Sequence, residues 1–144
     1  MKVSSANARR RMQNTRQRDT PIELSLRSAM HRLGLRFRLH ARIIPNSTRT
    51  ADIIFPTEKV AIFVDSCFWH CCPVHRTIPK ANREWWKRKL AENRRRDSNT
   101  NNRLRRLGWI TIRVWEHESF EGAAREITKV VKRRRGRYAA RARM

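Results

Sequence analysis

Residues 51–64 read ADIIFPTEKVAIFV and contain two short apolar runs, Ala51–Phe55 and Val60–Val64. The segment between them, PTEK, is typical of a turn, and two apolar runs that a turn separates predict two neighbouring strands. Asp52 stands inside the first run. A buried carboxylate is costly unless it is paired or binds a metal ion, so Asp52 is a candidate metal ligand. An aspartate that faces water from an edge strand is the alternative.

A helix is predicted upstream of these strands. The segment Thr20-Pro21-Ile22-Glu23 matches a capping box, with Thr20 as the N-cap and Glu23 as the third helical residue. Apolar residues then recur at helical spacing up to Leu33, and Gly34 supplies the C-cap. In this interpretation Glu23 is a capping residue.

Three further elements are predicted downstream. Residues 82–107 are polar and helix-forming, and a kink or break is possible in the Arg-, Asn- and Ser-rich part, 94–102. Residues 109–115, WITIRVW, alternate as a strand does, and residues 121–132 carry one apolar helical face. The order helix, strand, strand, helix, strand, helix predicts an α/β fold, a small sheet with helices packed on it.

The composition predicts a nucleic-acid partner. The 144 residues include 35 Lys and Arg against 12 Asp and Glu, a formal net charge of +23, and cations that neutralise phosphates release counterions. Solubility or an acidic protein partner is the alternative. We expect one domain, residues 19–132, between a flexible basic N-terminal arm, 1–18, and a basic C-terminal tail, 133–144. Without a long apolar run or an apolar leader, we expect no membrane association and a cytoplasmic, nucleoid-associated protein.

The densest group of reactive side chains follows the second predicted strand, in the segment CFWHCCPVH at 67–75. Cysteines and histidines at this density in a cytoplasmic chain favour zinc over a disulfide. Tetrahedral zinc needs four ligands. Cys67, Cys72 and His75 have the clearest local spacing, and His117, just after the last predicted strand, is well placed as the fourth. Cys71 in place of Cys72 stays open.

In order along the chain, several segments resemble the very short patch repair DNA mismatch endonucleases. The resemblance spans residues 8–120, and CFWH-x-C-P-x-H with a distal VWEHE is its most specific part. It implies a restriction-endonuclease-like fold, with a mixed central sheet flanked by helices. It also implies a magnesium-dependent enzyme that nicks one strand 5′ of the thymine in a T:G mismatch. The matching segments are Thr20–Glu23, Ala51-Asp52, Phe63–His70, Glu84-Trp85-Trp86, Gly108-Trp109 and Val114-Trp115-Glu116.

The substrate that the resemblance implies is double-stranded DNA containing a T:G mismatch. Such mismatches arise when 5-methylcytosine deaminates. A functional link to a cytosine methyltransferase and a repair polymerase is therefore also implied.

The resemblance implies residue roles as well. Asp52 would be the principal magnesium ligand beside the backbone carbonyl of Val64, His70 would activate the attacking water, and Glu23 would be the supporting acid. The aromatic side chains implied to enter the DNA are Phe68, Trp69 and Trp86. The implied ligands of the structural zinc ion are Cys67, Cys72, His75 and His117. One departure is Ser66, where the family usually has a glycine, because a turn with positive φ would tolerate serine poorly.

Two other functions fit the same residues. One is a related magnesium-dependent nuclease with another mismatch or duplex specificity. The other is a non-enzymatic nucleic-acid-binding protein with a structural zinc site, for which the charge and the Cys/His cluster would suffice. Glu23, Asp52 and His70 separate the enzyme from the binder, because a pure binder has no need of an acid on an apolar strand.

Overall fold

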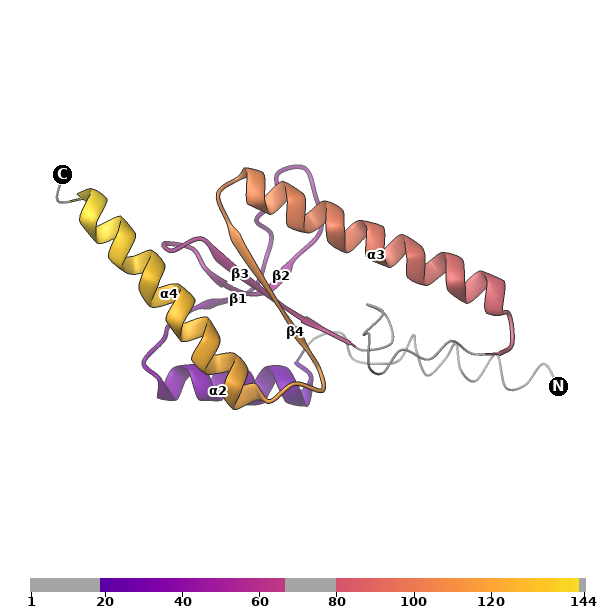
Figure 1. Ribbon diagram of the computed structural model, residues 1–144, viewed down its shortest axis with the longest axis horizontal. Helices are drawn as coiled ribbons and strands as arrows, with labels where there is room; N and C mark the ends of the chain where they lie inside the picture. The colour runs from indigo at the N-terminus through magenta and orange to yellow at the C-terminus, as the bar shows by residue number, and fades with distance from the viewer. Residues whose placement is uncertain (1–18, 67–79, 143–144) are drawn as a thin grey trace.

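The computed structural model describes residues 19–66 and 80–142, and their side chains up to residue 137. The N-terminal arm predicted for residues 1–18 lies outside this part. Within it, three helices and four strands follow one another (Figure 1) as α2 (Pro21–Arg32), β1 (Arg38–Ala41), β2 (Ala51–Phe55), β3 (Val60–Asp65), α3 (Arg83–Arg106), β4 (Ile110–Trp115) and α4 (Phe120–Ala142). The predicted α/β class and the predicted order of elements are confirmed, with β1 as an addition.

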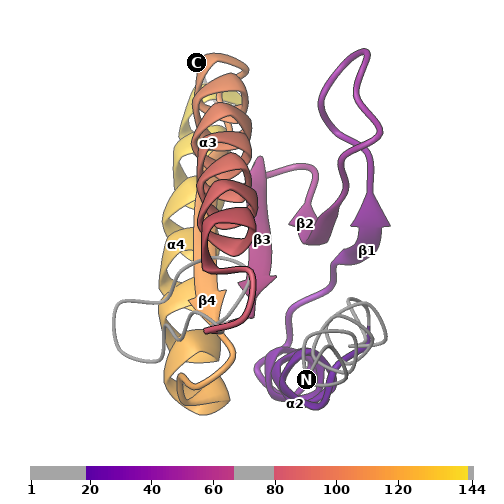
Figure 2. The same ribbon diagram turned by 90° about the vertical axis from the view of Figure 1, so that its right-hand side faces the viewer.

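The four strands form one mixed sheet in the order β1-β2-β3-β4 (Figure 2). β2 pairs antiparallel with both β1 and β3, whereas β3 and β4 are parallel because α3 crosses between them. The register pairs Asp65 with Trp115, so β3 and β4 end at the same level. Since β2 runs the opposite way, its first residues lie at this same end of the sheet.

Helices cover both faces of the sheet. α2 and α4 lie together on one side and α3 lies on the other (Figure 1). The core under α2 and α4 joins these two helices to one face of the sheet through apolar side chains that include Leu26, Met30, Ile53, Ile62, Val114, Ile127 and Val131. On the opposite face, Leu104 of α3 packs with Ile54, Ala61 and Phe63. Burial of these side chains drives folding and fixes the level of each helix on the sheet.

The ends of α2 follow the predicted signals. The Thr20 hydroxyl accepts a hydrogen bond from the Glu23 backbone N–H at 3.4 Å, which confirms Thr20 as the N-cap. The helix ends in a left-handed turn at Gly34, whose φ is +86°, and the Leu35 N–H donates to the Met30 carbonyl at 3.0 Å. Glycine adopts this conformation without steric cost, so the stop signal was interpreted correctly.

β1 was not predicted. Its four residues, RLHA, show no alternation of buried and exposed side chains, because Arg38 and Leu39 are both exposed. Strand formation there depends on the ladder to β2, which the local sequence does not specify.

The two long helices differ from the prediction. α3 is continuous through residues 94–102, where a break was considered. Arg49, on the loop before β2, donates to Thr100 at 2.7 Å and to Asn99 at 2.9 Å, so tertiary contacts support this weak helical segment. α4 continues to Ala142, into the range assigned to the C-terminal tail, and Arg135 pairs with Glu58 at 3.1 Å. None of the described helices is long and apolar enough to span a membrane.

Candidate functional site

The structure describes five of the predicted site residues: Glu23, Asp52, Val64, Trp86 and His117. The others lie outside the described residues and keep the status of predictions; they are Cys67, Phe68, Trp69, His70, Cys72 and His75.

Asp52 and Val64 meet at the end of the sheet where β3 stops. The Val64 backbone N–H donates to the Asp52 carboxylate at 2.7 Å. The next carbonyl along β3, that of Asp65, accepts from the Glu116 N–H on the β4 side. Because backbone groups of successive strand residues point to opposite sides, the Val64 carbonyl faces β2, as its N–H does. The Asp52 carboxylate and the Val64 carbonyl, the two oxygen donors predicted for magnesium, therefore both lie on the side of β3 that faces β2.

This pair of donors suits a hard cation. Magnesium prefers carboxylate and carbonyl oxygens, and Asp52 is half-buried between the fully buried Ala51 and Ile53. The alternative that Asp52 lies on an edge strand is wrong, since β2 is an interior strand between β1 and β3. Magnesium binding by Asp52 and Val64 stays a prediction.

Glu23 is a buried acid at the start of α2, with only 1% of its surface exposed. Its carboxylate accepts from the Asp19 backbone N–H at 2.9 Å and from the Arg27 guanidinium at 3.1 Å. In a capping box this carboxylate would bond to the N–H of Thr20, so the observed bond is one residue further upstream. Burial raises the pKa of Glu23 above its ordinary value of 4.5, against the opposing effects of the Asp19 N–H and Arg27.

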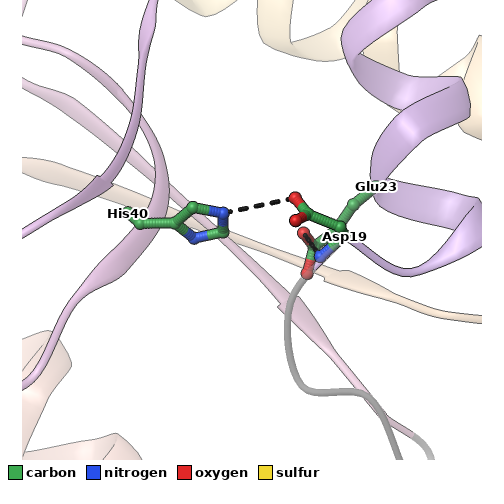
Figure 3. A group of neighbouring side chains, drawn as sticks. All are labelled: Asp19, Glu23 and His40. Carbon is green, nitrogen blue, oxygen red and sulfur yellow. Dashed lines mark hydrogen bonds and ion pairs between the residues drawn. The ribbon is translucent and has the colours of Figure 1, made fainter.

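Asp19 and His40 complete a cluster around Glu23 (Figure 3). The ligand atoms of these three residues lie within 4.8 Å of one another, and within the described part of the chain they are the one such group. His40 Nε2 lies 3.4 Å from Asp19 Oδ1. The hydrogen bond from Arg27, followed by that with His40, lowers the pKa of Asp19.

The cluster adjoins the strand that carries Asp52. The β1–β2 ladder pairs Leu39 with Ile53 and Ala41 with Ala51, so His40 and Asp52 occupy opposing positions between these pairs. His40 has a φ of +48°, which is uncommon for a residue other than glycine and is often found at functional sites. Sequence analysis missed Asp19, although it directly precedes the N-cap Thr20, and it missed His40 because only the fold brings that residue to the cluster.

Two other predicted site residues are placed at the edges of this region. Trp86 is 1% exposed and meets the 37% exposed Trp85 edge to face, with 4.7 Å between ring centroids. Contact of Trp86 with DNA stays a prediction and would need its surroundings to open. His117 is exposed and follows the end of β4 by two residues. Ser66 does not have a positive φ, so the departure from glycine there carries no backbone strain.

Replacing Glu23 with glutamine should change how stability depends on pH. Because the pKa of Glu23 is raised in the folded state, the unfolded chain releases this proton first, and the wild type loses stability as pH rises from 4.5 through the folded-state pKa. Glutamine has no proton to lose. The free energy of unfolding of Glu23→Gln should therefore rise relative to the wild type over this window.

Urea unfolding at several values between about pH 4 and about pH 8 measures this difference. The exposed Glu126→Gln on α4 is the matched control, because the Glu126 carboxylate pairs with Lys129 at the surface. A difference between Glu23→Gln and the wild type that is constant or falls with pH would contradict the assignment.

Known proteins similar to this chain are DNA-cleaving enzymes. Residues 2–76 match the family model described as DNA mismatch endonuclease Vsr. The chain is 41% identical over 121 residues to the type II nicking enzyme V.NaeI of Lentzea aerocolonigenes, covering 83% of this chain and 73% of that protein. It is 36% identical over 119 residues to the type II nicking enzyme V.XorIIP of Xanthomonas oryzae, covering 81% and 85%. It is 35% identical over 101 residues to the DNA mismatch endonuclease Vsr of Escherichia coli, covering 69% and 62%.

Proposed function

Because the chain belongs to the Vsr family of DNA mismatch endonucleases, we propose that it nicks one strand of duplex DNA 5′ of the thymine in a T:G mismatch, with magnesium as the cofactor. Family membership makes the protein a nuclease that acts on DNA and favours the enzyme over the non-enzymatic binder. Two of the relatives are named as nicking enzymes, which supports cleavage of a single strand.

The observation that carries the proposal is the pairing of Asp52 with Val64. An acid on an interior strand, 2.7 Å from the backbone of the neighbouring strand, places a carboxylate and a carbonyl oxygen where two strands meet. A divalent ion held by these oxygens would stabilise the charge that develops on the phosphate during cleavage. The mixed sheet with helices on both faces is consistent with a restriction-endonuclease-like fold, which we include in the proposal.

The remaining residues have the roles that the resemblance implies. A neutral imidazole at His70 would take the proton of the attacking water, a role for which histidine is the commonest side chain. Glu23 assists from α2, and Phe68, Trp69 and Trp86 enter the DNA beside the mismatch. Insertion between base pairs costs less where pairing is already weak, and this difference favours the mismatch. A zinc ion held by Cys67, Cys72, His75 and His117 would be structural.

The biological context follows from the substrate. T:G pairs form when 5-methylcytosine deaminates, so a cytosine methyltransferase makes the base from which the lesion arises, and a repair polymerase resynthesises the strand from the nick. Acting on chromosomal DNA, the protein would work in the cytoplasm at the nucleoid.

A strand-specific nicking assay tests the proposal. One labelled duplex carries a single T:G pair and a second is fully paired, and each is incubated with magnesium or with EDTA. We expect a magnesium-dependent nick 5′ of the mismatched thymine and an intact paired duplex. Cleavage of both duplexes would retain the nuclease and remove the mismatch specificity. Binding of both without cleavage would overturn the proposed activity.

A further inference from the structure

Arg27 occupies the centre of the cluster around Glu23. Its Nη2 atom lies 2.7 Å from Asp19 Oδ1, 3.1 Å from Glu23 Oε2 and 3.3 Å from His40 Nε2. A divalent ion bound by these three residues would have to take nearly the same position. The guanidinium therefore supplies the positive charge that this group of ligands requires, and the cluster is complete without a metal ion.

The contacts of Arg27 join two elements that the backbone leaves separate. Glu23 and Arg27 stand one turn apart on α2, whereas His40 belongs to β1, opposite Asp52 on β2. Polar contacts thus run from α2 through Arg27 to His40 on β1, and on the neighbouring strand β2 the Asp52 carboxylate accepts from the Val64 N–H of β3. The Arg27 side chain is 13% exposed and that of Glu23 is 1% exposed, so water screens this ion pair weakly, whereas Asp19 is 52% exposed.

We propose that Arg27 is a positioning residue for strand cleavage: it fixes the Glu23 carboxylate and the His40 ring beside Asp52 by standing in the place of a cation between them. The inference rests on the proposed function, because Glu23 and Asp52 have their roles from it. In this role Arg27 acts through Glu23 and His40 and not on the scissile phosphate. Its Nη2 atom alone reaches two carboxylates and an imidazole, which a neutral side chain such as methionine cannot do.

The kinetic test uses the full chain and whichever duplex the wild type nicks. Arg27→Met should lower the single-turnover rate at saturating DNA by about 10- to 100-fold, the usual cost of removing a residue that orients a catalytic group, with DNA affinity nearly unchanged. Arg27→Lys should recover part of the loss, because it restores the charge. In a Glu23→Gln background, Arg27→Met should lower the single-turnover rate little further, since both changes disrupt the same contact between Arg27 and Glu23.

Arg32→Met is the matched control, because Arg32 is exposed in the last turn of the same helix. Circular dichroism at the assay temperature establishes that each variant is folded. The inference would be overturned if Arg27→Met keeps full activity, or if it loses as much DNA affinity as cleavage rate. It would also be overturned if Arg27→Lys is no more active than Arg27→Met, or if the losses of rate in Arg27→Met and Glu23→Gln add.

A spectroscopic readout separates this inference from the proposed activity. In ¹H–¹⁵N spectra of the imidazole rings, with His40 assigned through His40→Gln, the His40 signals should shift in Arg27→Met and stay in place in Arg32→Met. Unmoved signals would overturn the positioning role even if the wild type cleaves DNA. If the His40 signals shift in Arg27→Met but the wild type cleaves neither duplex, the result would support the contact between Arg27 and His40 and reject the proposed activity.

Discussion

Replacing Asp52 with asparagine should lower strand cleavage by about 1000-fold or more, equal to about 4 kcal/mol of transition-state stabilisation. The change removes the negative charge that would hold magnesium, and magnesium supplies most of the electrostatic stabilisation in the proposed reaction. The amide oxygen of asparagine can still accept the hydrogen bond that Val64 donates to Asp52. Folding should therefore survive, and DNA affinity should stay the same or rise because a charge that repels phosphate is lost.

Glu58→Gln is the control for this experiment. Glu58 is also buried and also belongs to the β2–β3 hairpin, but it lies in the turn at the other end, where it pairs with Arg135. Its replacement should leave the cleavage rate nearly unchanged. Rates come from single-turnover assays over a range of magnesium concentrations, and affinities from binding without magnesium. Asp52→Asn with the cleavage rate of the wild type would mean that the acid on β2 has only a structural role.

The sequence predicted the elements whose signals are local. The apolar run Ala51–Phe55, the alternation in Trp109–Trp115 and the caps of α2 each depend on residues within a few positions, and all were found. β1 was missed because its side chains follow no buried pattern and its backbone is ordered by β2. The continuity of α3 was underestimated for the same reason, since Arg49 supports it from a distant loop.

The residues of the candidate site likewise divide into those with a local signal in the sequence and those that depend on distant contacts. Asp52 could be singled out because an acid inside an apolar run is conspicuous, and Glu23 because a helix start demands a residue of its type. Arg27 stands four residues after Glu23 on the helix, a spacing at which an acid and a base pair, so this partner had a local signal that Arg32 lacks. The contact with His40 had none, because His40 enters only through β1.

A second buried ion pair lies on the opposite face of the sheet, under α3. Asp65, 3% exposed at the end of β3, accepts two hydrogen bonds from Arg113 Nη1 on β4, both at 3.0 Å. The same guanidinium donates to Asn101 on α3 at 3.0 Å and lies 3.7 Å from Asp97. It also stacks over the Phe63 ring at 4.5 Å from the centroid. Arg113 therefore ties α3 to the end of the sheet where Asp52 lies.

Arg113→Met should lower the free energy of unfolding by about 3 kcal/mol, because it leaves a buried carboxylate without its guanidinium while retaining most of the side-chain volume. Urea unfolding followed by circular dichroism measures the change. The exposed Arg125→Met on α4 is the matched control and should change stability by no more than about 0.5 kcal/mol.

The double variant Arg113→Met with Asp65→Asn separates the ion pair from simple packing. If the cost of the single change comes from the buried charge, neutralising Asp65 should restore part of the stability, since a buried amide is cheaper than a buried carboxylate that lacks its guanidinium. If the losses of stability in Arg113→Met and Asp65→Asn add in the double variant instead, Arg113 stabilises the fold through its contacts with Asn101 and Phe63. The attachment of α3 would then depend on packing, and the pairing with Asp65 would contribute little to it.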